Sequence, residues 1–114
     1  MAEMAIGSGL GAAIDLAAVP LAAAVNPATA DDLACLLTVA ATETPGRFLC
    51  EVAEADAAAF AAVCADLPWA WLGHVTDDGQ LTLKAAETVV ADVPVAALDA
   101  AWRAPSRAHT GEYC

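Results

Sequence analysis

The hydrophobic positions of this chain fall into short runs separated by turn residues, and their spacing predicts alternating strands and helices. The first six residues have the character of a helix that ends at the glycines after Ile6, and residues 12–16 form a short apolar run typical of a strand. Apolar residues then recur at helical spacing from Leu33 to Ala40, behind the N-cap candidate Thr29. This pattern predicts a helix over residues 30–41.

The middle of the chain combines one further strand pattern with one further helix pattern. Residues 47–52 are nearly continuous in apolar character, which predicts a strand that is partly buried on both sides. Residues 54–66 predict a helix that Pro68 ends. One stripe of this helix is apolar and is expected to face a sheet, and it consists of Phe60, Val63, Cys64 and Leu67.

The last third predicts strands at residues 70–75, 81–84 and 88–93, followed by a helix. Asp77, Asp78 and Gly79 are typical of a hairpin turn between the first two of these strands. Pro94 suits the first position of a helix. The inner face of that helix is expected to carry Val95, Leu98 and Trp102.

The element order is roughly β-α-β-α-β-β-α, which indicates an α+β domain. Two or three helices packed on one face of a mixed or antiparallel sheet is the economical arrangement for it. With 114 residues the chain is one domain by size. We expect the domain to span residues 1–103, with a helix truncated at its N-terminal end, and residues 104–114 to be a flexible tail.

Composition narrows the classes of function. The net charge is −11, with Arg47, Lys84, Arg103 and Arg107 as the only lysine or arginine residues, so binding to nucleic acid or to an anionic membrane is not expected. No uncharged stretch reaches the roughly 18–20 residues of a membrane span, and no basic segment of a secretory signal follows Met1. We expect a cytoplasmic protein with its cysteines reduced, namely Cys35, Cys50, Cys64 and Cys114.

Few residues are candidates for catalysis or for binding a ligand or metal. Glu43 lies at a helix-to-strand junction, where a carboxylate can hold a ligand amine or a metal, or can instead pair with Arg47. Arg47 can bind a phosphate or carboxylate, or can form a buried ion pair with Glu43 or Asp15. His74 lies on an apolar strand without a partner motif and is interpreted as structural. No zinc spacing, phosphate-binding glycine loop or catalytic triad is present, so we expect no catalytic or metal-binding residue in this chain.

Two tryptophans, Trp69 and Trp71, allow two interpretations. Tryptophan is enriched at protein interfaces, so this face can contact another domain or a second copy in a homo-oligomer. The alternative is packing beneath the terminal helix that carries Trp102.

Four segments in order resemble one family. Residues 9–16 with Val19-Pro20-Leu21 resemble its G-L-G-[AV]-x-[IV]-D-L-x-x-[VI]-P-L opening, and residues 41–49 (ATETPGRFL) resemble its S-E-[ST]-x-x-R-[MF]-L segment. Residues 72–81 resemble its [IL]-G-x-V-T-x-D-G-x-L hairpin, and residues 90–102 resemble its closing D-[LV]-P-V-x-x-L-x-x-[AS]-W. The family is the C-terminal domain shared by purine-biosynthetic amidine ligases and aminoimidazole ribonucleotide synthases.

The resemblance implies a structural, cleft-completing domain of an ATP-dependent ligase rather than a complete enzyme. In such ligases the catalytic and metal-binding residues lie in N-terminal-type domains, so ATP and Mg²⁺ are expected in the full-length enzyme and no cofactor in this chain. The resemblance also suggests substrate binding at Glu43, Thr44 and Arg47, although Pro45 replaces the amide residue of the ligase E-S-Q motif. The isolated chain is predicted to be inactive. Its expected partners are the remaining domains of the parent enzyme; the alternatives are a free-standing binding or dimerisation module, or a small enzyme using Glu43 with His74.

Overall fold

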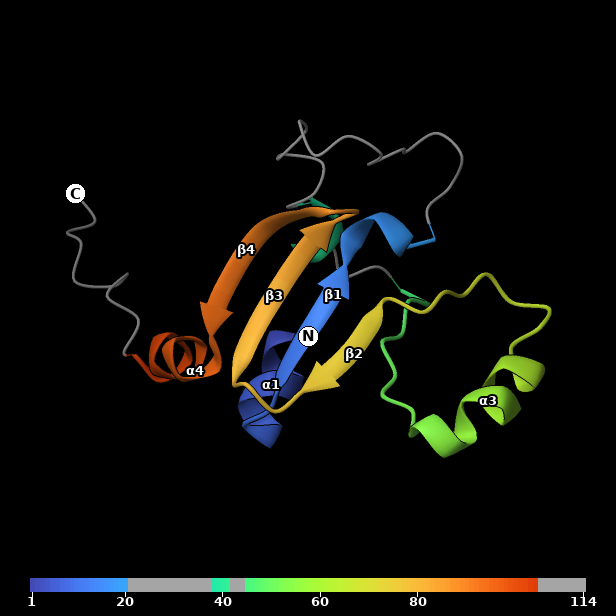
Figure 1. The fold of residues 1–114 in the computed structure, drawn as a ribbon, viewed down its shortest axis with the longest axis horizontal. Coiled ribbons are helices and arrows are strands. Elements are labelled where there is room, and N and C mark those ends of the chain that lie inside the picture. Colours follow the sequence, from blue (N-terminus) through green and yellow to red (C-terminus); the bar gives the residue numbers. More distant parts are fainter. Residues whose placement is uncertain (21–37, 42–44, 105–114) are drawn as a thin grey trace, which may run out of the picture.

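Four strands form a mixed sheet, which is the centre of the fold (Figure 1). The computed structural model describes residues 1–20, 38–41 and 45–104. The strands are β1 (Gly11–Asp15), β2 (Gly73–Thr76), β3 (Gln80–Ala85) and β4 (Thr88–Pro94), in the spatial order β2-β1-β3-β4. β1 is antiparallel to β2 and parallel to β3, and β3 is antiparallel to β4. The α+β prediction with a mixed sheet is confirmed.

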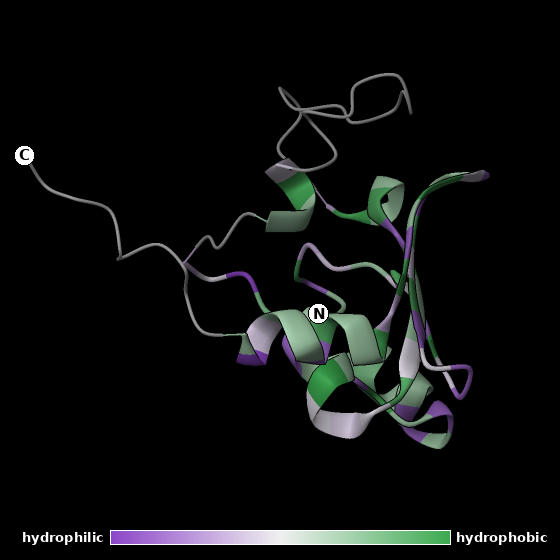
Figure 2. Ribbon diagram, turned by 90° about the vertical axis from the view of Figure 1, so that its left-hand side faces the viewer, coloured by the Kyte–Doolittle hydropathy of each residue, from purple (hydrophilic) through white to green (hydrophobic). Residues whose placement is uncertain are grey.

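Helices cover one face of this sheet, as expected for a two-layer domain. α1 (Ala2–Ser8) packs against α4 (Val95–Arg103). Figure 2 shows both helices, and the helical residues 38–41, on the same side of the strands. The opposite face is open along the strands and carries polar side chains; there the Thr82 hydroxyl donates to Asp92 Oδ1 at 2.9 Å across β3 and β4.

The core is small and lies between the sheet and the helical layer. Ile14, Leu16 and Ala85 form its buried cluster, and Leu16, in the 3₁₀ turn Leu16–Ala18, is 2% exposed. Half-buried side chains complete the cluster, namely Met1, Ala12, Ala40, Leu72, Leu83 and Val90. Alternation along β1 and β3 produces this core, because Ala12 and Ile14 are in register with Leu81 and Leu83 on the same face.

Local hydrogen bonds fix the connections between strands. Residues 77–79 connect β2 to β3, and Gly79 supplies the positive φ of 68°. They do not close the predicted hairpin, because β1 lies between β2 and β3 in the sheet and pairs with both. The Val95 N–H donates to the Gly79 carbonyl at 2.9 Å, which anchors the start of α4 on this turn. The β3–β4 turn contains Ala86 at φ 52°, and its N–H donates to Asp15 Oδ1 at 3.0 Å.

The segment between β1 and β2 departs from two expectations. Residues 47–52 form no strand, because their backbone pairs with none of the four strands. The helix expected over 54–66 is shorter, with a 3₁₀ turn at Glu54–Asp56 and α3 at Ala57–Val63. α3 packs mainly on that 3₁₀ turn and, through Phe60, on Trp69 and Trp71 rather than on the sheet, so the stripe predicted to face a sheet does not do so. Val63 is 83% exposed and Leu67 is 62% exposed.

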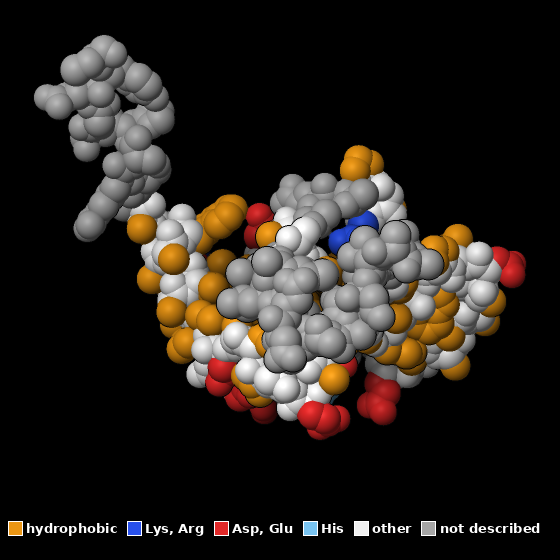
Figure 3. All heavy atoms as spheres, turned by 90° about the horizontal axis from the view of Figure 1, so that it is seen from above, with side chains coloured by type: hydrophobic (Ala, Val, Ile, Leu, Met, Phe, Trp, Pro, Cys, Tyr) orange, Lys and Arg blue, Asp and Glu red, His pale blue; other side chains and the backbone are white. Residues whose placement is uncertain are grey.

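Two aromatic expectations are corrected as well. Trp102 does not lie on the inner face of α4, because it is 67% exposed while Val95 is buried. Trp69 and Trp71 do not pack beneath α4; they pack on Phe60 of α3. We call residues 54–72, which contain α3 and these tryptophans, the α3 lobe. Figure 3, viewed from above, shows exposed hydrophobic side chains over this lobe, at its right-hand end.

The expected domain boundary and tail are not fully visible in the structure. The flexible tail predicted from residue 104 lies almost entirely outside the described residues, as does the predicted helix over 30–41 except for its last turn. No helix in the described part of the chain is both long enough and apolar enough to cross a membrane.

Candidate functional site

Of the three residues predicted to bind substrate, only Arg47 lies in the described part of the chain. Its side chain is exposed, and no described carboxylate lies within 4.0 Å of it. Glu43 and Thr44 lie outside the described residues, so substrate binding by this group stays a prediction.

The expected ion pair between Arg47 and Asp15 is not formed. Asp15 Oδ1 instead accepts the Ala17 N–H at 2.9 Å and the Ala86 N–H at 3.0 Å. The first bond caps the 3₁₀ turn after β1, and the second connects β1 to the β3–β4 turn, 71 residues further along the chain. The aspartate of the D-L segment is therefore a structural residue, which sequence reasoning had considered only as a partner for arginine.

Asp78, in the turn between β2 and β3, also has a structural role. Asp78 Oδ1 accepts the Thr76 hydroxyl at 2.7 Å and the Gln80 N–H at 2.9 Å. These two bonds, above all the one from the Thr76 hydroxyl, lower the pKa of Asp78 below its usual value of 3.8, because they stabilise the carboxylate. The carboxylate closes the turn between β2 and β3.

His74 lies on β2, opposite Ala13 of β1, and its side chain is exposed. No described carboxylate hydrogen-bonds to its ring, so the structure supplies no orienting group for acid–base catalysis in the part of the chain that it describes. The hypothesis of a small enzyme using Glu43 with His74 stays untested, because Glu43 is outside that part.

The two cysteines in the described part of the chain form neither a disulfide nor a metal site. Cys50 is exposed and Cys64 is half-buried, and both are free. Cys35 and Cys114 lie outside the described residues. Within the described ranges no three His, Cys, Asp or Glu side chains lie close enough together to hold a metal ion.

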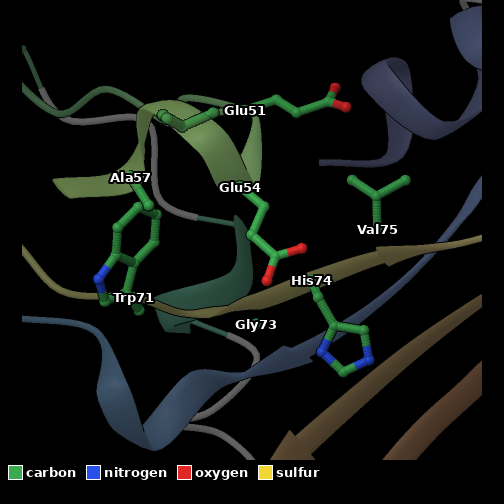
Figure 4. A pocket seen from close by; sticks show the side chains of 8 residues that line it. Glu51, Glu54, Ala57, Trp71, Gly73, His74 and Val75 are labelled. Atoms are coloured by element: carbon green, nitrogen blue, oxygen red, sulfur yellow. The ribbon is translucent and has the colours of Figure 1, made fainter. Parts of the chain in front are cut away.

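An open pocket of about 440 Å³ lies between residues 51–57 and β2. Figure 4 shows Trp71 at one end of it, with Glu54 projecting its carboxylate toward β2. The polar or aromatic residues that line the pocket are Glu51, Glu54, Trp71 and His74, and the others are Val52, Ala57, Gly73 and Val75. Sequence reasoning did not select Glu51 or Glu54, since they become neighbours of β2 only through the course of an irregular segment.

The indole of Trp71 is held in place by two other rings. Its centroid lies 5.2 Å from that of Trp69, nearly perpendicular at 88°, and 6.0 Å from that of Phe60. Trp69 is in turn edge-on to Phe60 at 5.8 Å. Such edge-to-face contacts between aromatic rings are favourable. They give the pocket a fixed aromatic wall.

The described site therefore consists of a structural sheet and an open pocket at its edge, in a two-layer α+β domain. A family model described as AIR synthase related protein, C-terminal domain, matches residues 1–86. Because the match covers 86 of the 114 residues, the chain belongs to this family, which places it among purine-biosynthesis-type, ATP-binding enzymes. Comparison with curated proteins gave no match, and comparison with solved structures gave none either.

Proposed function

We propose that this chain serves as the C-terminal domain of phosphoribosylformylglycinamidine synthase, the ligase that forms the amidine of formylglycinamide ribonucleotide with ATP. In this role it packs against the other domains and completes their cleft, without catalysing the reaction alone. The assignment to this particular ligase, rather than to the family alone, rests on the four sequence segments that resemble it. Three of them fall within the residues that match the family model.

One observation carries the structural part of this proposal: three of the four family-like segments build the sheet and α4. Residues 9–16 form β1 and its Asp15 cap, residues 72–81 form β2, the turn after it and the start of β3, and residues 90–102 form the end of β4 and most of α4. Two of their aspartates have structural roles: Asp15 caps the 3₁₀ turn after β1, and Asp78 closes the turn between β2 and β3.

The exposed apolar surface supports a domain that is covered by a neighbour. Large hydrophobic side chains are exposed on several elements, whereas the buried cluster in the described part of the chain has three residues. Extended apolar surface of this kind is typical of an interaction site. The most exposed large side chains are Phe48, Val63, Leu67 and Trp102.

The experiment is an immunological one on cells that express the native gene. An antibody raised against this domain is expected to detect a band far larger than 11.4 kDa, and depletion with it is expected to remove amidine-forming activity from the extract. A band at 11.4 kDa with full activity left after depletion would contradict the proposal and favour the free-standing module. Amidine formation from ATP, substrate and ammonia by the isolated chain would contradict its inactivity.

A further inference from the structure

The outer edge of β2 has backbone groups that no strand of the described sheet uses. β2 pairs with β1 alone and is an end strand. The Asp15 N–H donates to the Leu72 carbonyl at 2.7 Å, so Leu72 faces β1. Because backbone direction alternates along an antiparallel strand, His74 and Thr76 also face β1, whereas Gly73 and Val75 face outward. Their N–H and C=O groups have no hydrogen-bond partner among the described residues.

The pocket lies directly along this edge. Gly73, His74 and Val75 line its strand side (Figure 4), and Val52 and Ala57 are the apolar residues that line it from outside the strand. Free backbone donors beside a pocket for a side chain are the two components of binding by strand addition: the backbone gives affinity and the pocket selects the side chain.

The pocket favours a cation that has an apolar stem. Trp71, fixed by Phe60 and Trp69, offers an aromatic face, and Glu54 projects its carboxylate toward β2, while Glu51 also lines the pocket. Neither carboxylate has a lysine, arginine or histidine partner within 4.0 Å in the described part of the chain. A guanidinium or ammonium group can contact an indole and a carboxylate at once, while its aliphatic stem packs on apolar side chains.

Charge argues against a second copy of this chain as the occupant. Each copy carries a net charge of −11, so two β2 edges would bring like-charged rims together. We propose that the free edge of β2 binds an extended, basic peptide segment of a partner protein, which adds a strand beside Gly73 and Val75 and places an arginine or lysine side chain in the pocket. This peptide site is independent of the purine-ligase assignment.

The test uses the full chain and a blocked pentapeptide with the sequence threonine, valine, arginine, valine, threonine. Titration followed by amide NMR is expected to shift the Gly73 and Val75 signals saturably and to slow exchange of their N–H groups. Three matched peptides separate the contributions: one with N-methylated backbone positions, one with glutamate at the centre and one with neutral citrulline there. The first is expected not to bind, and the other two are expected to bind more weakly than the arginine peptide.

Variants of the chain test the same contacts from the other side. Val75→Pro removes an outward N–H without removing a bond to β1, so it is expected to abolish peptide binding while the unfolding temperature changes little. Glu54→Gln is expected to weaken the arginine peptide about three-fold, the scale of an exposed ion pair, and to leave the citrulline peptide unchanged. Glu87→Gln, which removes a charge at the distant β3–β4 turn, is the matched control and is expected to have no effect.

Three results would overturn the proposal. The first is slow exchange of Gly73 and Val75 in the free chain, since the edge would then already be covered by its own segment or, if the protection depends on concentration, by a second copy. The second is that the N-methylated peptide binds as tightly as the unmethylated arginine peptide. The third is equal binding of the arginine and glutamate peptides.

Discussion

The sheet and the α3 lobe are neighbours in one chain, yet their stability has different sources. In the sheet, Ile14, Leu16 and Ala85 are buried together, and Asp15 connects β1 to a turn 71 residues away. The α3 lobe has no fully buried side chain, and its main internal contacts are three aromatic rings. Since apolar burial is the main favourable contribution to folding, the sheet is expected to set the global stability and the lobe to open locally.

Truncation of the most buried side chain is the largest expected effect. Leu16→Ala removes a side chain that is 2% exposed and leaves a cavity between the sheet and the helices. It is expected to lower the free energy of unfolding by about 3 kcal/mol, measured by urea denaturation.

Leu67→Ala in the α3 lobe is the matched control for this truncation. Leu67 is 62% exposed, so the same change there is expected to cost less than about 0.5 kcal/mol. Similar losses for the two variants would contradict the distinction between the sheet and the lobe.

Gly73→Ala tests the contact between β2 and β1. A Cβ at Gly73 would meet the carbonyl group of Ala13, which is backbone and cannot rotate away. We expect a loss of about 2 kcal/mol, with increased amide exchange along β2. Gly7→Ala provides the control, because the space beside Gly7 is open. Unchanged stability of Gly73→Ala would mean that β2 does not pack this closely on β1.

Asp15→Ala tests the long-range connection within the sheet. It removes the acceptor of two backbone N–H groups, from Ala17 and Ala86, and is expected to cost about 1.5 kcal/mol. Asp77→Ala, in the exposed turn between β2 and β3, is the comparison, since no described group hydrogen-bonds to its side chain. Equal unfolding midpoints for the two variants would show that the hydrogen bonds of Asp15 do not stabilise the sheet.

The smallest expected effect is on the stability of the fold at acidic pH, through Asp78. The folded pKa of Asp78 is below its ordinary value of 3.8, so its contribution to stability is present above pH 3.8 and is lost as the pH falls through the lower folded value. Thr76→Val removes the hydroxyl donor and is expected to reduce the loss of stability below pH 3.8. An unchanged acid profile in thermal unfolding would contradict this role of the hydroxyl.

The regular part of the fold could be predicted from sequence because its information is local. Short apolar runs between turn residues indicated β1, β3 and β4, and Pro94 marked the start of α4. The turn at Asp77-Asp78-Gly79 was also indicated, but the hairpin pairing expected across it was wrong, because β1 lies between β2 and β3. The prediction of a strand at residues 47–52 was wrong, because a segment of strand-like composition forms a strand only where the edge of another strand pairs with it. That pairing depends on distant parts of the chain. The prediction that Trp102 lies on the inner face of α4 was wrong for a similar reason, because helical spacing does not show which face of the helix meets α1 and β4.

The sequence by itself determined the fold class, the family and the strong negative charge, since each of these depends on residue types and their order along the chain. Tertiary structure alone decided that Asp15 reaches Ala86, that Phe60 packs on Trp71, and that Glu51 and Glu54 lie beside the free edge of β2. These contacts join residues that are far apart in sequence or that lie in irregular segments. Their geometry depends on how the chain returns to the sheet, which no local pattern of residues encodes.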